Sequence, residues 1–244
     1  MQILIPMSGR GSRFTIEGYE KPKPLIEFFG KPMIEHVLEN LGTEHTFTLC
    51  VLRSHYDSDP DLFARLGKTV AQLNLVFVDK LTQGAAETCL LARKFIKANE
   101  PLMIANCDQL QESWDPISFE TWFIESELNG CIFTFFKNDP AYSYVEIDTN
   151  NLVTRTVEKQ VISEHATTGI YVWSKGKDFV WAAEKMIADN VRVNSEFYVC
   201  PVFNWNIARG ARIGIYNKIV HWPIGVPNDL KIFIEAHPNG IESY

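Results

Sequence analysis

Two short segments near the start of the chain combine glycine with basic residues in a way suited to binding phosphate. The first follows the apolar run over residues 2–6, and the second is Lys23-Pro-Leu25. Glycines let backbone N–H groups turn toward phosphate oxygens. An arginine adds a planar fork of donors and a lysine a compact point charge. We therefore expect a nucleoside triphosphate site formed by Met7, Ser8, Gly9, Gly11, Ser12, Arg13 and Lys23.

The order of these residues separates the site from better-known phosphate loops. A Gly-x-Gly pair alone is typical of an ordinary turn. No Gly-Lys-Ser or Gly-Lys-Thr follows it, and the third glycine of a dinucleotide fingerprint is absent. The combination Gly-x-Gly-x-Arg-Phe with a later Lys-Pro-Leu resembles the signature of the sugar-phosphate nucleotidyltransferases, or nucleoside-diphosphate-sugar pyrophosphorylases. The resemblance implies an enzyme that joins a nucleoside triphosphate to a sugar or polyol phosphate and releases pyrophosphate.

A lone acid follows the apolar strand expected over residues 102–106. In Asn106-Cys-Asp108 the carboxylate could hold Mg²⁺, which needs only one or two protein carboxylates, and we expect Asn106 to bind the nucleotide. An aspartate that simply starts a turn is the alternative. In the family a strand-end aspartate of this kind ligates the metal. The resemblance thus implies that Asp108 holds Mg²⁺, that Lys23 contacts the α-phosphate and the attacking oxygen, and that Arg13 contacts the departing pyrophosphate.

The segment Gln83-Gly84 precedes a run of small residues that would let a flat ring lie against the backbone. A glutamine amide can form paired hydrogen bonds with the edge of a base. The same sequence is also a common junction between a loop and a helix. The segment resembles the family's base-reading loop, which implies that Gln83 and Gly84 bind a pyrimidine.

Residues for the acceptor lie further along the chain. Glu158-Lys159 resembles the family's Glu-Lys pair, in which the glutamate binds sugar hydroxyls and the lysine the acceptor's phosphate, although exposed Glu-Lys pairs are common. Gly169 lies in the following strand, where glycine permits close approach of a ligand. Ser143 stands where many relatives have glycine, and His221-Trp-Pro-Ile-Gly225 lacks the family's second metal-binding aspartate. The nearby Asp229 is more consistent with the first turn of a helix.

Composition limits the partners. A net charge of −7 argues against nucleic acid, because binding to a phosphate backbone needs a basic face. The chain contains neither an apolar stretch long enough to cross a bilayer nor a leader-like start, so we expect no membrane partner and a cytoplasmic location.

The five cysteines are widely spaced and are expected to be reduced core residues. The resemblance also implies a homo-oligomer, since relatives often form dimers or tetramers.

Alternating β-rich and helical patterns over the first hundred residues are typical of a parallel sheet covered by helices. We expect an α/β fold, Rossmann-like, with a mixed, mainly parallel central sheet, helices on both faces and a β-rich acceptor-binding lobe. The expected strands cover residues 2–6, 46–52, 73–79, 102–106, 131–137, 144–148, 152–158, 167–173, 212–216 and 219–222. The expected helices cover residues 32–41, 59–66, 85–98, 177–189, 196–209 and 228–236. A turn over 149–151 should join two of the strands. We expect one domain over 1–244, with a nucleotide-binding half at 1–110 and an acceptor-binding half at 111–244.

Two other function classes remain open at this level. A glycosyltransferase that consumes a nucleotide sugar would account for Asp108 but not for Arg13 and Lys23. A protein that binds nucleotide sugars without turnover is consistent with the missing second aspartate. Only the nucleotidyltransferase would release pyrophosphate from a triphosphate.

Overall fold

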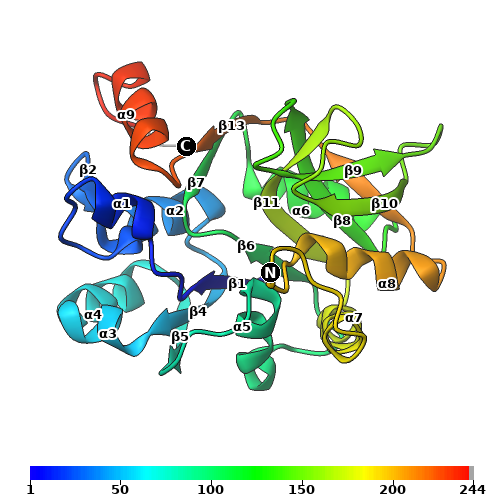
Figure 1. The fold of residues 1–244 in the computed structure, drawn as a ribbon, viewed down its shortest axis with the longest axis horizontal. Helices are drawn as coiled ribbons and strands as arrows, with labels where there is room; N and C mark the ends of the chain where they lie inside the picture. Colours follow the sequence, from blue (N-terminus) through cyan, green and yellow to red (C-terminus); the bar gives the residue numbers. More distant parts are fainter. Residues whose placement is uncertain (242–244) are drawn as a thin grey trace.

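A nine-stranded mixed sheet runs through the molecule (Figure 1). The computed structural model describes residues 1–241. The strands of the sheet are β1 (Gln2–Met7), β4 (Thr46–Leu52), β5 (Gln72–Val78), β6 (Leu102–Ala105), β8 (Gly130–Phe136), β9 (Ser143–Ile147), β10 (Val153–Glu158), β11 (His165–Trp173) and β12 (Ile213–Tyr216). Their order is β10-β9-β11-β6-β1-β4-β5, with β8 pairing β11 and β12. Strands β6, β1, β4 and β5 are parallel, whereas β11 runs antiparallel to β6.

Helices cover both faces of this sheet, as expected. They are α2 (Met33–Leu41), α3 (Arg53–Ser58), α4 (Pro60–Thr69), α5 (Ala85–Leu91), α6 (Pro116–Glu125), α7 (Gly176–Ala188), α8 (Phe203–Ala208) and α9 (Pro227–Ala236). Alternate residues of β1 enter two separate apolar cores. Ile3 and Ile5 pack in the core that includes residues of α2, α4, α6 and α9, whereas Leu4 packs in the core that includes α5, α7 and α8. The sheet is therefore buried on both sides.

Strand β11 joins the parallel part of the sheet to the β-rich part. Residues 170–173 pair with β6, while Ala166 pairs with Tyr144 of β9. The register with β8 shifts between Thr167 and Tyr171, so the strand bulges there, and Gly169 in the bulge has φ +90°. Strands β9 and β10 form the expected hairpin, whose turn places Asn151 at φ 58°.

Two expected helices differ from the structure. Helix α5 ends at Leu91 and is followed by a single 3₁₀ turn, η2 (Arg93–Phe95). In residues 93–98 only Phe95 and Ile96 pack against the core, and two adjacent residues do not form an apolar helical face. The expected helix over 196–209 begins only at the 3₁₀ turn η3 (Cys200–Val202) and continues as α8. Glu196 is held by backbone hydrogen bonds to Val193 around a turn whose two central residues have positive φ. The Phe197 N–H and carbonyl bond to Gln83 and Ala86, so these backbone groups are not available to a helix.

Several short elements were not predicted. Helix α1 (Ser12–Ile16), the 3₁₀ turn η1 (Lys23–Leu25), helices α3 and α6, and the two-residue strands β2 (Glu27–Phe28) and β3 (Lys31–Pro32) are among them. Strand β7 (Gln109–Glu112) is another, and it pairs antiparallel with β13 (Val220–Pro223) in a small separate sheet beside α9 (Figure 1). This small sheet brings the segment after Asp108 next to a part of the chain 110 residues away.

Candidate active site

One large cavity, of about 940 Å³, is lined by seven of the fifteen predicted site residues, whereas Lys23, Gln83 and Gly84 are not part of its lining. Its walls come from the end of β6, the bulge of β11, the start of β9, the end of β10, the segment before α8, and β13 with α9. The predicted residues that line it are Arg13, Asn106, Asp108, Ser143, Glu158, Lys159 and Gly169. The structure therefore brings residues of the expected nucleotide and acceptor halves to one space.

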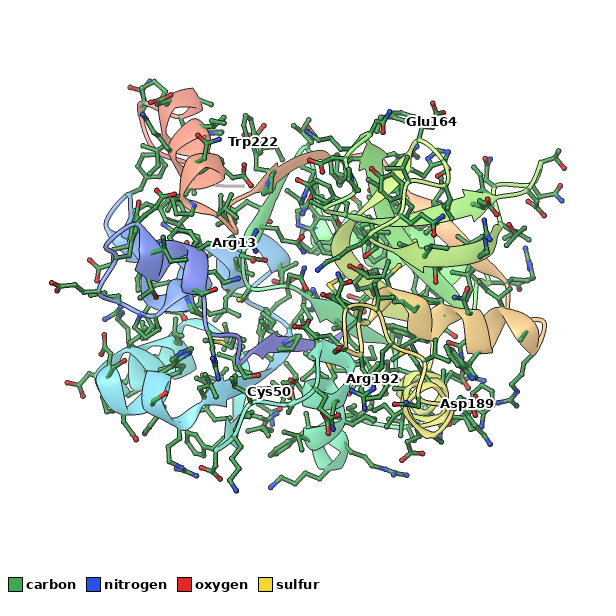
Figure 2. All side chains as sticks on the ribbon, viewed as in Figure 1. Arg13, Cys50, Glu164, Asp189, Arg192 and Trp222 are labelled. Carbon is green, nitrogen blue, oxygen red and sulfur yellow. The ribbon has the colours of Figure 1, made fainter. Side chains whose placement is uncertain are left out.

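The two phosphate-binding segments touch each other at Gly11. This residue has φ +65° at the start of α1, and a Cβ at this position would lie 2.7 Å from the Cβ of Lys23. Gly9 faces open space, since a Cβ there would have no neighbouring atom within 4 Å. The exposed Arg13, labelled beside α1 in Figure 2, has no ion pair among residues 1–241. Glycine at position 11 thus allows the close approach, and the guanidinium of Arg13 is available to a ligand.

The remaining residues of the first segment have different surroundings. The side chain of Met7 is buried in a core, so only its backbone can face a ligand. Ser12 is exposed. Ser8 is buried, and its Oγ lies 3.3 Å from Oγ1 of Thr88, a residue of α5. This contact holds the end of β1 beside the helix that follows Gln83 and Gly84.

Lys23 and Asp108 form an ion pair at the edge of the cavity. The Lys23 Nζ lies 2.5 Å from Asp108 Oδ2, and the two side chains are 17% and 20% exposed. Burial opposes the charge of both groups, but their mutual attraction prevails. It raises the pKa of Lys23 to about 12 and lowers the pKa of Asp108 below its usual value. Gly225 lies against this carboxylate, since a Cβ there would be 2.6 Å from Asp108 Oδ2.

Glu158 and Lys159, adjacent in sequence, have separate roles in the structure. Glu158 is 7% exposed, pairs in register with Ser143 across the β9–β10 hairpin, and accepts a hydrogen bond from the Ser143 hydroxyl. Burial raises the pKa of Glu158 to about 7, although Ser143 and Lys159 act in the opposite direction. Lys159 leaves the strand at φ 55°, and its Nζ donates to the hydroxyl of Tyr198 at 2.7 Å.

The predicted base loop is held through its backbone. The Gln83 N–H donates to the carboxylate of Glu87, and the Gln83 carbonyl accepts from the Phe197 N–H at 2.7 Å. Gly84, at φ +135°, lies so close to Phe197 that a Cβ would be 2.8 Å from its carbonyl carbon. Gln83 is exposed. The loop backbone is therefore fixed, while the Gln83 side chain is oriented to solvent and free to meet a base.

Sequence reasoning missed part of the cavity wall. Gln109 Nε2 and Thr168 Oγ1 are buried without a hydrogen-bond partner in the described residues. They flank Gly169, where a Cβ would be 3.0 Å from Gln109 Oε1. His221 also lines the wall, and its burial lowers its pKa to about 3, against the attraction of Asp108. A polar glutamine directly after Asp108 was the one local signal that could have indicated Gln109.

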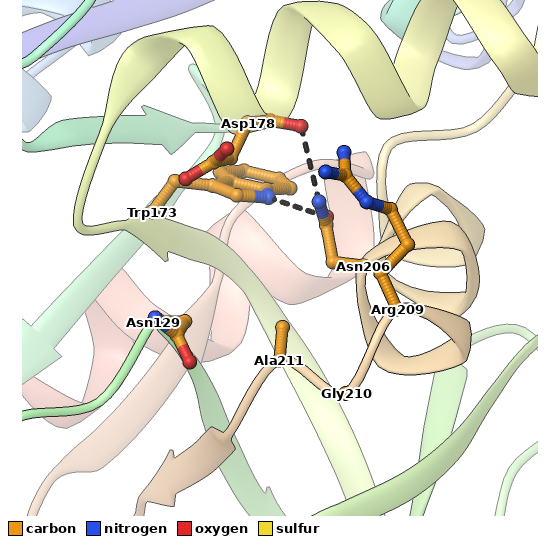
Figure 3. A pocket seen from close by; sticks show the side chains of 7 residues that line it. All are labelled: Asn129, Trp173, Asp178, Asn206, Arg209, Gly210 and Ala211. Carbon is orange, nitrogen blue, oxygen red and sulfur yellow. Dashed lines mark hydrogen bonds between the residues drawn. The ribbon is translucent and has the colours of Figure 1, made fainter.

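A second cavity, of about 300 Å³, lies elsewhere in the fold and is shown in Figure 3. Its wall is held together internally: Asn206 accepts from the Trp173 indole N–H at 2.9 Å and donates to the Asp178 carbonyl at 3.1 Å. These bonds occupy the Asn206 amide and the Trp173 N–H, and none of the predicted site residues lines this cavity. The larger cavity is the better candidate for the active site.

Other predicted features concern the whole chain. All five cysteines are buried and unbridged, as expected of reduced core residues. Within residues 1–241, no group of three His, Cys, Asp or Glu side chains is arranged to hold a metal ion. None of the helices described is long and apolar enough to cross a membrane. Asp229 lies in the first turn of α9, as expected, and also lines the large cavity.

Known structures share this fold. A nucleoside-diphosphate-sugar pyrophosphorylase from Vibrio cholerae RC9 superposes with a TM-score of 0.82 at 23% identity, covering 96% of this chain and 99% of that one. A putative glucose-1-phosphate thymidylyltransferase from Bacillus anthracis gives 0.79 at 20% identity, covering 100% and 98%.

Sequence comparison identifies the family. The chain is 30% identical over 182 residues to mannose-1-phosphate guanyltransferase 2 of Candida glabrata, covering 70% of this chain and 49% of that protein. It therefore spans about half the length of the curated relatives it matches. The family model for nucleotidyl transferase matches residues 3–196, which include the phosphate segments, Asp108, Glu158 and Lys159. The chain belongs to the nucleotidyl transferase family.

Proposed function

We propose that this protein transfers a nucleotidyl group from a nucleoside triphosphate to a sugar or polyol phosphate and releases pyrophosphate. The observation that carries the proposal is the single cavity of about 940 Å³ that Arg13 and Asp108 share with Glu158 and Lys159. Residues 1–110 supply the nucleotide side and residues 111–244 supply most of the acceptor side. A homo-oligomer belongs to the same proposal.

The reaction needs charge and alignment more than a reactive side chain. The acceptor's phosphate oxygen attacks the α-phosphate, and both reactants are anions that repel each other. Lys23, with its raised pKa, remains charged at neutral pH and lies against Asp108, where it can neutralise the α-phosphate and the incoming oxygen. Arg13 has no ion-pair partner in the part of the chain that the structure describes, and it can bind the leaving pyrophosphate with its planar fork. Lys159 binds the acceptor's phosphate, and Glu158 with Ser143 binds its hydroxyls.

The residues around Asp108 fit a magnesium ion bound mainly through substrate. Asp108 Oδ2 bonds to Lys23, while Oδ1 has no hydrogen-bond partner in the described residues. Mg²⁺ typically takes one or two protein carboxylates and completes its shell with water and phosphate oxygens. Pro223 and Ile224 precede Gly225 where the family has its second aspartate, so Asp108 would be the principal protein ligand. When bound, the ion would supply positive charge to the triphosphate oxygens.

For the base, we propose a pyrimidine read by Gln83 and Gly84. Hydrogen bonds to Phe197 and Glu87 fix the Gln83 backbone. The exposed side-chain amide of Gln83 can therefore bond to a carbonyl and a ring N–H of the base from a defined position. A guanine nucleotide is the second candidate, because the relatives at about 30% identity are mannose-1-phosphate guanyltransferases. A glutamine amide can pair with guanine as well.

Pyrophosphate release tests the proposal. UTP, dTTP, CTP, GTP and ATP are each incubated with mannose 1-phosphate, glucose 1-phosphate and inositol 1-phosphate, with Mg²⁺ and without it. Pyrophosphate formation that depends on both substrates supports nucleotidyl transfer. Hydrolysis of a nucleotide sugar, or nucleotide binding without turnover across the panel, would overturn it. In the same panel, a kcat/KM for GTP or ATP above that for the pyrimidine triphosphates would rule out the pyrimidine assignment.

A Gln83→Ala variant examines the base contact directly. Removing the amide should leave polar groups of the base unpaired, at about 1–3 kcal/mol, or roughly tenfold to hundredfold in kcat/KM for the preferred triphosphate. The ranking of the five triphosphates should flatten. An unchanged ranking would show that Gln83 does not read the base.

A further inference from the structure

Residues 193–199, which we call the 193–199 loop, form an ordered connection between α7 and η3. Val193 and Glu196 exchange backbone hydrogen bonds of 3.1 and 2.9 Å around Asn194 and Ser195, which both have positive φ. This is the pattern of a type I′ hairpin turn, which fixes the backbone tightly. Arg192, labelled beside α7 in Figure 2, stacks its guanidinium 3.9 Å from the centre of the Phe197 ring. The loop is thus held in one position.

One side of the 193–199 loop is attached to the predicted base loop. The Phe197 N–H donates to the Gln83 carbonyl at 2.7 Å, and the Phe197 carbonyl accepts from the Ala86 N–H at 3.0 Å. Gly84 fits between them only because it has no Cβ. Phe197 itself is 1% exposed. These hydrogen bonds fix the backbone of the 193–199 loop against the predicted base loop.

The next residue reaches the acceptor side. The Tyr198 hydroxyl accepts a hydrogen bond from Lys159 Nζ at 2.7 Å, and the ammonium lies 4.8 Å from the centre of the Tyr198 ring. Both residues line the large cavity. The nearest carboxylate in sequence, Glu158, bonds instead to Ser143. Tyr198 is therefore the partner that holds the otherwise exposed and flexible Lys159 side chain.

We propose that Tyr198 positions Lys159 for the phosphate of the acceptor, an inference that rests on the function proposed above. An ammonium group has three donors, and one of them is directed to Tyr198. The other two remain for phosphate oxygens, from a side chain whose rotamers are already restricted before the acceptor binds. Tyr198 acts through Lys159 and is a positioning residue.

The same contact relates the two substrates. Phe197 is fixed to the base loop and Tyr198 directly follows it, so the position of Lys159 is set from the nucleotide side of the cavity. The distance between the two phosphate groups is then determined by backbone hydrogen bonds and one phenol rather than by a flexible side chain alone. The phosphate of the acceptor is thereby bound at a defined place in the cavity, which favours acceptor affinity.

Steady-state kinetics of Tyr198→Phe, Lys159→Met and the double variant test the inference with the best acceptor of the panel. Tyr198→Phe keeps the ring and removes the hydroxyl, and Tyr216→Phe is the matched control, because Tyr216 packs among aromatic rings away from the cavity. We expect Tyr198→Phe to raise the KM for the acceptor roughly threefold to tenfold. The KM for the triphosphate and the kcat should each stay within about twofold, and Tyr216→Phe should match the wild type.

The double variant separates positioning from a direct role. If Tyr198 acts through Lys159, removing its hydroxyl should have no further effect on the acceptor KM in the Lys159→Met background. An additional increase there would overturn the inference, and so would an unchanged KM in Tyr198→Phe when Lys159→Met raises it. An acceptor KM that Lys159→Met leaves unchanged would instead overturn the acceptor site of the proposed function, and this inference with it.

Discussion

Replacing Lys23 with methionine removes the ammonium from the pair with Asp108 and keeps a side chain of similar length. The two atoms lie 2.5 Å apart in side chains that are 17% and 20% exposed. Breaking a fully buried pair by removing one partner costs about 3–5 kcal/mol, and partial exposure reduces this. We expect a loss of about 1–3 kcal/mol in the free energy of unfolding at pH 7, and a fall in Tm of roughly 3–10 °C.

The loss should depend on pH in a defined direction. The pKa of Asp108 is lowered in the folded protein, so its pairing stabilises the fold above the pKa of the unfolded carboxyl. This stabilisation is lost as the pH falls through the folded pKa. The difference between wild type and Lys23→Met should therefore be full at neutral pH and shrink in acid below about pH 4.

We expect the same substitution to lower the turnover number strongly, in addition to its effect on stability. If Lys23 supplies charge at the α-phosphate as proposed, Lys23→Met should lower kcat by roughly two to three orders of magnitude while changing triphosphate affinity less. Pyrophosphate release measures the rate, and urea denaturation at several pH values measures stability. Lys21→Met is the control, since Lys21 pairs with Glu27 at 2.6 Å but both side chains are more than half exposed. Such a surface pair contributes about 0–1 kcal/mol.

A double variant completes the comparison. Lys23→Met with Asp108→Asn removes both charges and should recover much of the lost stability without recovering turnover. The reasoning is refuted if Lys23→Met keeps more than about a tenth of the wild-type kcat, which is well above the expected range. It is also refuted if Lys21→Met loses as much stability as Lys23→Met.

Three further outcomes are expected. Asp108→Asn should abolish activity at every Mg²⁺ concentration in a titration, because the amide lacks the charge that attracts the cation; unchanged metal dependence would place the metal elsewhere. In the folded protein the pKa of Glu158 is about 7, above its unfolded value. The free energy of unfolding should therefore fall as the pH rises from about 4.5 to 7, by roughly 3 kcal/mol at most, and denaturation of Glu158→Gln should not show this fall. Gly84→Ala should lower the free energy of unfolding by about 1–3 kcal/mol through its clash with Phe197, whereas Gly9→Ala, with open space around it, should unfold like the wild type.

The features that the sequence predicted depend on residues close together in the chain. The spacing of apolar residues predicted the central sheet and the helices that cover it. Strands of a sheet that is buried on both faces are nearly continuous apolar runs, which are easy to find in a sequence. Gly11 and Lys23 were expected to serve one site, and they touch in the structure. Asp108 was expected just after a strand, and it follows β6, which ends at Ala105. Its role in binding a metal stays a prediction.

What the sequence could not predict depends on distant pairing. His221 reaches the cavity because β13 pairs with β7, and short strands of this kind carry little periodic signal. Tyr198 was placed inside an expected helix, but the backbone of the preceding Phe197 bonds to the distant Gln83 and Ala86 instead of forming helical hydrogen bonds. Its partner Lys159 lies 39 positions earlier. Neither contact follows from residue type or spacing alone.

The continuity of β11 limits how the large cavity could close around a ligand. The strand is hydrogen-bonded to β6 at residues 170–173 and to β8 and β9 near residues 165–167, so it belongs to both walls of the cavity. A rigid hinge rotation of one wall against the other would break backbone hydrogen bonds in a strand whose residues 166–173 are buried. Under the proposed function, any closure would fall to exposed segments such as residues 9–10 and 136–138, and the sheet would set the distance between the two bound phosphates.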